Sequence, residues 1–144
     1  MSTCTFFGHR ECPESVKPKL KEVLVDLITN HDVRRFYVGN QGQFDAYVRS
    51  VLRELKTEYP QIDYTVVLAY MPSKKDEHTD LSDTLLPEEI ASTPPRYAID
   101  RRNKWMLKHS DYVVTYITHP SGGAAKYAEM AKAQRKTVIN LTSP

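Results

Sequence analysis

The chain has 144 residues, of which 40% are hydrophobic and 26% are charged, a composition typical of a soluble globular domain. Its net charge of +2 is too small to favour nucleic acid or an anionic membrane as a partner. No apolar run approaches the roughly 20 residues of a membrane-spanning helix. The N-terminus lacks the basic and apolar regions of a signal peptide, and two cysteines do not make a disulfide framework. We therefore expect a single cytoplasmic domain over 1–144 with reduced thiols.

Along the chain, short apolar runs that predict strands alternate with apolar residues at helical spacing that predict helices. In order, they are strand 3–7, helix 14–30, strand 35–38, helix 43–58, strand 62–70, helix 96–109, strand 111–117, helix 124–134 and strand 137–141. This alternation predicts an α/β fold, a Rossmann-like three-layer sandwich with a mainly parallel sheet of about five strands. With a strand order of 3-2-1-4-5, the first and fourth strands are neighbours at the switch point, where such sheets bind ligands.

Residues 71–95 interrupt the alternation. They contain four prolines and six acidic residues and show no clear periodicity. A structureless segment of this length is too long for an ordinary connection within a compact domain. We expect a long irregular insertion that serves either as a functional lid or as a mobile loop.

A tight glycine turn follows the fourth predicted strand. Ser121 is expected to be the N-cap of the last helix, and Gly122 and Gly123 then open that helix with bare backbone. Ser121, Gly122, Gly123 and the following Ala124 are predicted to bind the ligand. Unpaired N–H groups and the positive end of a helix dipole meet at such a turn. The turn therefore predicts a site for a phosphate or another anion.

Glu129 lies seven residues after Gly122, which is about two helical turns. We expect it on the same face of the helix, leaning toward a ligand that rests on the glycine turn. The alternative is a solvent-exposed Glu129 that pairs with Lys126 or Lys132 at helical spacing.

Arg102 continues an apolar stripe on the predicted helix 96–109. A buried charge is costly unless it is paired, and a planar guanidinium suits phosphate or carboxylate. We expect Arg102 to contact a ligand, or else to snorkel or to form an internal ion pair with Glu129 or Asp45. Arg96, at the end of the insertion, is either a surface charge or a residue that closes over the ligand.

Two further turns follow the first and second predicted strands. With the expected strand order, the first faces residues 119–123 across the crevice and the second flanks both. The predicted ligand-binding residues of these turns and of the helix start that follows are Gly8, His9, Arg10, Gly39, Asn40, Gln41, Gly42 and Asp45. Asp45 has a second reading, in which its carboxylate caps free N–H groups of the second helix.

A metal site built from Cys4, His9 and Cys12 lacks a fourth ligand at useful spacing. The sequence contains none of the hydrolase, phosphate-loop or metalloprotease motifs that would indicate another chemistry. We therefore expect neither a metal nor a cofactor.

Residues 4–10, 36–45 and 110–126 together resemble the SLOG superfamily, and most closely the YpsA-like Rossmann-type proteins of bacteria and their mobile elements. The resemblance spans nearly the whole chain. It implies a small-molecule, nucleotide-type ligand, and by analogy a possible homodimer or higher homo-oligomer.

SLOG relatives include the Lonely Guy phosphoribohydrolases, which cleave the N-glycosidic bond of nucleoside monophosphates and carry the signature PGGxGTxxE. The resemblance maps its glutamate to Glu129 and an upstream arginine to Arg102, which implies catalytic roles for both. Ser121, Ala125 and Lys126 depart from the signature. Other SLOG domains bind nucleotide-derived signals such as ADP-ribose-type molecules.

Two functions remain open at this point. The altered signature favours a module that binds a nucleotide-derived ligand through the glycine turns, as a sensor or a sequestering domain, with Lys126 beside the ligand. The retained Glu129 and Arg102 favour the alternative, an N-glycosidase of phosphoribohydrolase type acting on nucleoside monophosphates.

Overall fold

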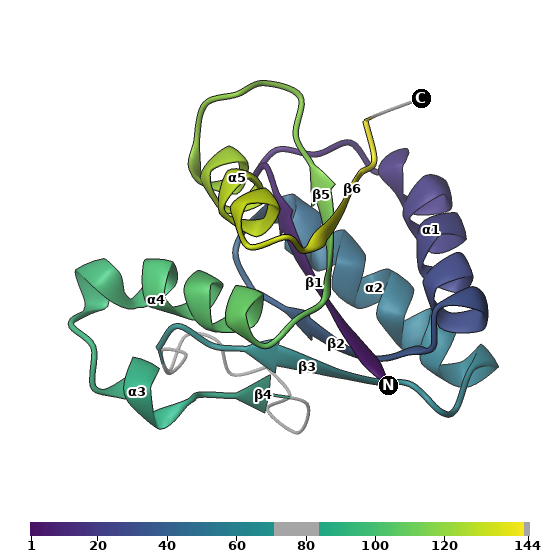
Figure 1. The fold of residues 1–144 in the computed structure, drawn as a ribbon, viewed down its shortest axis with the longest axis horizontal. Helices are drawn as coiled ribbons and strands as arrows, with labels where there is room; N and C mark the ends of the chain where they lie inside the picture. Colours follow the sequence, from purple (N-terminus) through teal and green to yellow (C-terminus); the bar gives the residue numbers. More distant parts are fainter. Residues whose placement is uncertain (71–83, 143–144) are drawn as a thin grey trace.

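The computed structural model describes residues 1–70 and 84–142 (Figure 1). Its elements, in chain order, are β1 Ser2–Gly8, α1 Val16–Asn30, β2 Val33–Val38, α2 Gly42–Glu58, β3 Asp63–Val67, β4 Thr84–Leu85, α3 Glu88–Ala91, α4 Pro95–Lys108, β5 Tyr112–Tyr116, α5 Gly123–Ala133 and β6 Thr137–Asn140. The strands form one sheet in the order β4-β3-β2-β1-β5-β6, and every neighbouring pair is parallel. Among the described residues, no helix is long and apolar enough to cross a membrane.

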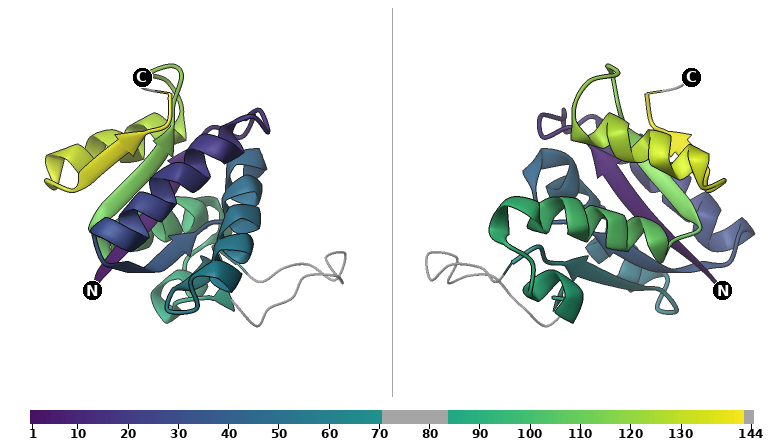
Figure 2. Two further views of the ribbon diagram at one scale, coloured as in Figure 1. Left: turned by 90° about the vertical axis from the view of Figure 1, so that its right-hand side faces the viewer. Right: turned by 60° about the vertical axis from the view of Figure 1, so that its left-hand side comes forward.

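The predicted α/β fold is confirmed, and the five predicted strands lie in the predicted order. β1 lies between β2 and β5 at the centre of the sheet, and helices cover both faces (Figures 1 and 2). α1 and α2 cover one face over a core that includes Leu24, Phe36 and Leu52. α4 and α5 cover the other over a smaller core that includes Met106 and Val113. The right-handed crossovers of parallel strands require this three-layer arrangement.

The stretch predicted to be irregular over 71–95 is partly regular. Its described part forms β4, which adds an edge strand beside β3, and the short helix α3. Pro87 and Pro94 are the N-caps of α3 and α4, and Pro95 is the first residue of α4. These prolines begin helices, where a fixed φ and a missing N–H are tolerated, so the prediction of an irregular segment up to residue 95 is wrong. The prediction of a lid or mobile loop at 71–83 lies outside the described residues.

Candidate functional site

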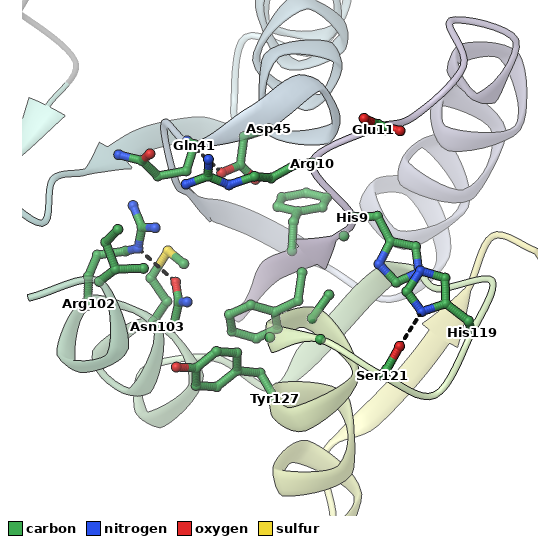
Figure 3. Close-up of a pocket in the computed structure, with 18 residues that line it drawn as sticks. His9, Arg10, Glu11, Gln41, Asp45, Arg102, Asn103, His119, Ser121 and Tyr127 are labelled. Atoms are coloured by element: carbon green, nitrogen blue, oxygen red, sulfur yellow. Dashed lines mark hydrogen bonds between the residues drawn. The ribbon is translucent and has the colours of Figure 1, made fainter. Parts of the chain in front are cut away.

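A cavity of about 480 Å³ opens where the carboxyl ends of β1 and β5 meet the starts of α2 and α5 (Figure 3). Its walls include the following predicted site residues: Gly8, His9, Arg10, Gln41, Asp45, Arg102, Ser121, Gly122, Gly123 and Ala124. Figure 3 shows Gln41, Asp45 and Arg10 along one side, and Tyr127 and Ser121 along the other. The turns after β1 and β5 thus face each other as the strand order predicts, although His9 and Thr118 in these turns are 109 residues apart in sequence.

α5 begins with free backbone N–H groups at the cavity wall. The N-cap is Gly122, with φ 99° and ψ 173°, and not Ser121 as predicted. Only glycine adopts this backbone conformation without strain, so the chain turns into the helix one residue later than expected. The hydroxyl of Ser121 instead lies 2.9 Å from Nδ1 of His119. The first N–H groups of a helix have no partner within it, and Gly123 and Ala124, which carry such groups, line the cavity.

Arg102 is buried at the cavity wall with 2% of its surface exposed. Its Nε donates to Oδ1 of Asn103 at 2.7 Å, and its Nη1 lies 3.3 Å from both Oδ1 of Asn40 and the carbonyl oxygen of Val67. These acceptors are all neutral. In the part of the chain that the structure describes, Arg102 forms no ion pair, neither with Asp45 nor with Glu129. Burial lowers the pKa of its guanidinium, although such a group stays charged in proteins.

Asp45 lies near Arg102 across the turn after β2. A Cβ atom on Gly39 would lie 2.7 Å from Oδ2 of Asp45 and 2.9 Å from Nη1 of Arg102, so both charged groups approach the turn because residue 39 has no side chain. Oδ2 of Asp45 accepts the backbone N–H of Gln41 at 3.0 Å, as the capping alternative predicts. Burial raises the pKa of Asp45, against the opposing effects of the Gln41 N–H and the charges of Arg102 and Arg49.

Two histidines connect the turns on either side of the cavity. The rings of His9 and His119 stack in parallel, with centroids 4.0 Å apart and an interplanar angle of 5°. Nε2 of His9 accepts the backbone N–H of Thr118 at 2.9 Å, which requires an unprotonated Nε2. Partial burial and the neighbouring His119 lower the pKa of His9. The neutral ring of His9 therefore holds the β5–α5 turn against the β1–α1 turn.

Tyr127 lines the cavity but is not among the predicted site residues. Its ring stacks on Phe7 with centroids 5.2 Å apart, and both rings line the cavity. Its hydroxyl donates to Asp100 in a short hydrogen bond. Burial and this bond raise the pKa of Tyr127 to about 12. Tyr127 lies three residues after Ala124, and this spacing in the sequence indicates that both side chains lie on the same face of α5.

Asp100 joins α4 to α5 just outside the cavity. Besides the Tyr127 hydroxyl, it binds Lys104 at 2.9 Å and Lys126 at 3.2 Å. Burial alone raises its pKa, but the hydrogen bonds from Tyr127, Lys104 and Lys126 lower it to about 2. Asn103, whose amide holds Arg102, also lines the cavity and was not predicted.

Glu129 does not point into the cavity. Its side chain is 75% exposed and pairs with Lys132 at 3.3 Å, in a separate groove beside β6. The expectation that it reaches a ligand on the glycine turn is wrong, and the exposed alternative describes the geometry. The prediction placed Glu129 two helical turns after Gly122, but Gly122 precedes the helix. The face of α5 that lines the cavity carries Ala124 and Tyr127 instead.

Other predicted ligand residues also lie outside the cavity wall. Lys126 is held by Asp100, and the guanidinium of Arg96 lies 4.7 Å from the ring of Tyr97. Gly39, Asn40 and Gly42 support the wall from behind: Asn40 binds Arg102, and a Cβ atom on Gly42 would lie 2.8 Å from Cα of Arg10.

Cys4 and Cys12 are buried free thiols, and burial raises the pKa of each, that of Cys12 to about 11. Across residues 1–70 and 84–142, no group of three His, Cys, Asp or Glu side chains converges as a metal site.

No family model and no curated protein matches this sequence. Among solved structures, DNA processing protein A (DprA) from Streptococcus pneumoniae superposes on 97% of this chain with a TM-score of 0.71 and 12% sequence identity. The chain therefore shares the Rossmann-like fold of this structure. It spans 50% of the length of the DprA chain. At this identity, the likeness is one of fold alone.

Proposed function

We propose that this SLOG-type domain binds a nucleotide-derived ligand, either a nucleoside phosphate or an ADP-ribose-type signal, in the cavity between β1, α4 and α5. The domain would act as a sensor or as a sequestering module. We also assign it to the YpsA-like branch, on the motifs at 4–10, 36–45 and 110–126.

The buried Arg102 carries the proposal. A guanidinium with 2% exposure and only neutral hydrogen-bond partners among the described residues leaves a positive charge at the cavity wall. The unpaired N–H groups at the start of α5 line the same cavity. Both features favour an anion, and a phosphate suits the planar donors of arginine and the start of a helix.

The size and composition of the cavity fit the remainder of a nucleotide. A volume of about 480 Å³ lies within the range of small-molecule sites. Phe7 and Tyr127 supply aromatic surface, and Gln41 and Asn103 supply polar groups. Hydrolysis by Glu129 has no geometric support, because its carboxylate lies outside this cavity.

The proposal is tested by measuring affinity for AMP, ADP-ribose and inorganic phosphate by calorimetry, after removal and mass analysis of any copurified ligand. Arg102→Met, which preserves volume, is expected to weaken nucleotide binding by at least about tenfold, because a hydrogen bond to a charged group contributes about 1.5–3 kcal/mol.

Arg101→Met is the matched control, because Arg101 is exposed on the same helix and does not line the cavity. It is expected to bind as the wild-type protein does. Failure of the stripped wild-type protein to bind any of the three probes would contradict the proposed function, and wild-type affinity in a folded Arg102→Met protein would make Arg102 purely structural.

A further inference from the structure

The cavity contains one buried carboxylate, that of Asp45, with 9% of the residue exposed. Its Oδ2 accepts the N–H of Gln41. No described residue donates a hydrogen bond to its Oδ1, and no described cation forms an ion pair with it. Oδ1 is therefore an open acceptor at the cavity wall, whereas the other acidic residue of the wall, Glu11, is exposed to solvent.

An open carboxylate selects the part of a ligand that can lie against it. It accepts hydrogen bonds but donates none while ionised, and it repels a phosphate. Arg102 lies beside Asp45 and partly offsets its charge, whereas the N–H donors at the start of α5 lie on the opposite side of the cavity (Figure 3). A ligand that satisfies both sides has an anionic group at one end and O–H or N–H donors away from it.

We propose that Asp45 binds the ribose hydroxyls of the ligand and makes the cavity selective for ribonucleotides over 2′-deoxyribonucleotides. The inference rests on the proposed nucleotide binding and names the part of the ligand that the α2 wall recognises. A vicinal diol presents two O–H donors, which match the two oxygens of a carboxylate.

The position of Asp45 favours the sugar over the base. Its neighbours on the wall, Arg10, Gln41 and Arg102, are polar or charged. The stacked rings of Phe7 and Tyr127 give the cavity an apolar aromatic surface, against which a base gains from burial and stacking. The ribose, which joins the base to the phosphate, is then the group left to contact Asp45.

The test compares AMP with 2′-deoxy-AMP by calorimetry on the wild-type protein and on Asp45→Asn. We expect the wild-type protein to bind AMP at least about tenfold more tightly, because a hydrogen bond to a charged acceptor is lost with the 2′-hydroxyl. Asp45→Asn keeps an amide oxygen for the Gln41 N–H, so the start of α2 is preserved. In this variant the affinity for AMP is expected to fall toward that for 2′-deoxy-AMP.

Asp63→Asn is the charge-matched control, because Asp63 is an exposed residue of β3 that pairs with Lys56 and lies outside the cavity. It is expected to keep the wild-type selectivity. Equal wild-type affinities for the two nucleotides would overturn this inference and leave the proposed function intact. Selectivity that persists in Asp45→Asn would overturn the role of Asp45.

If the wild-type protein binds neither nucleotide, both the proposed function and this inference are contradicted. If Asp45→Asn does not fold, the wild-type protein can be tested with AMP, 2′-deoxy-AMP and 3′-deoxy-AMP. We expect both deoxy nucleotides to bind more weakly than AMP. Equal affinity for all three nucleotides would contradict recognition of the diol.

Discussion

At the scale of single residues, the site depends on two buried charges of opposite sign that do not touch. Arg102 and Asp45 both approach Gly39, and each lowers the cost of burying the other through the weakly screened interior. Each also keeps hydrogen-bonding capacity for a ligand, because they do not form a direct ion pair. This arrangement explains how an arginine can lie in the apolar stripe of α4 and still have donors available for a ligand in the cavity.

Gly8 shows a close approach that only glycine permits. A Cβ atom at this position would lie 2.3 Å from the ring of Phe44. We expect Gly8→Ala to lower the free energy of unfolding by about 1–3 kcal/mol, the usual cost of overpacking. Urea denaturation checks this value. The double variant Gly8→Ala with Phe44→Leu relieves the clash, so its effects are expected to be less than additive; full additivity would contradict the assigned contact.

His9 predicts a dependence of stability on pH. Its pKa in the folded protein lies below the usual value of about 6.5, so the unfolded chain binds more protons as the pH falls below 6.5. The stability that the neutral ring contributes is present above this pH and is lost as the pH falls toward the folded pKa. Titration of the His9 ring by NMR is expected to give a midpoint below 6.5.

His9→Gln is the control for this prediction, because a glutamine oxygen can accept the Thr118 N–H but does not titrate. Its thermal midpoint should change less with pH below 6.5 than that of the wild-type protein. A midpoint at or above 6.5 for His9 would show that its Nε2 is not held as an acceptor.

At the scale of elements, the start of α5 is set by glycine conformation and not by a side-chain cap. Gly122 is the N-cap with no side-chain hydrogen bond, and the turn before it is held by Ser121 and His119. A larger residue at the N-cap would have to adopt a positive φ, which would displace the N–H groups that face the cavity.

The two glycines of this turn are therefore expected to respond differently to substitution. Gly122→Ala should cost about 1–3 kcal/mol of stability from backbone strain alone, because a Cβ atom there would meet nothing within 4 Å. Gly123 is helical, and a Cβ atom there would lie 4.0 Å from Tyr127. Gly123→Ala should be neutral or stabilising by up to about 1 kcal/mol. Chemical denaturation measures both, and equal effects would contradict the assigned backbone conformations.

At the scale of the whole molecule, the parallel sheet brings the site together. β1 pairs with β2 and β5, so the turns after these three strands meet at one edge although they come from distant parts of the chain. This convergence could be predicted, because alternating strands and helices with right-handed crossovers allow few strand orders. The same reasoning missed β4 and α3, whose short segments show no periodicity.

Part of the wall of the candidate cavity could also be predicted from the sequence. Glycine turns at strand ends and an arginine in an apolar stripe are local signals, and they identified Gly8, Gly122 and Arg102. Tyr127 was missed because an aromatic residue on an apolar helix face usually packs in the core. Here its ring packs on Phe7 and also lines the cavity. Glu129 was misplaced because its predicted direction depended on a helix start that was wrong by one residue.

Hydrophobic periodicity and chain connectivity are enough to predict the longer helices, the strands other than β4 and the order of those strands. Which side chains face the cavity depends on tertiary contacts. Helix rotation places Tyr127 inside and Glu129 outside. Packing between α4 and the turn after β2 surrounds Arg102 with neutral acceptors, and Asp45 lies nearby with no ion pair to any described residue. Such contacts join residues that are distant in the chain, and no local pattern encodes their relative orientation.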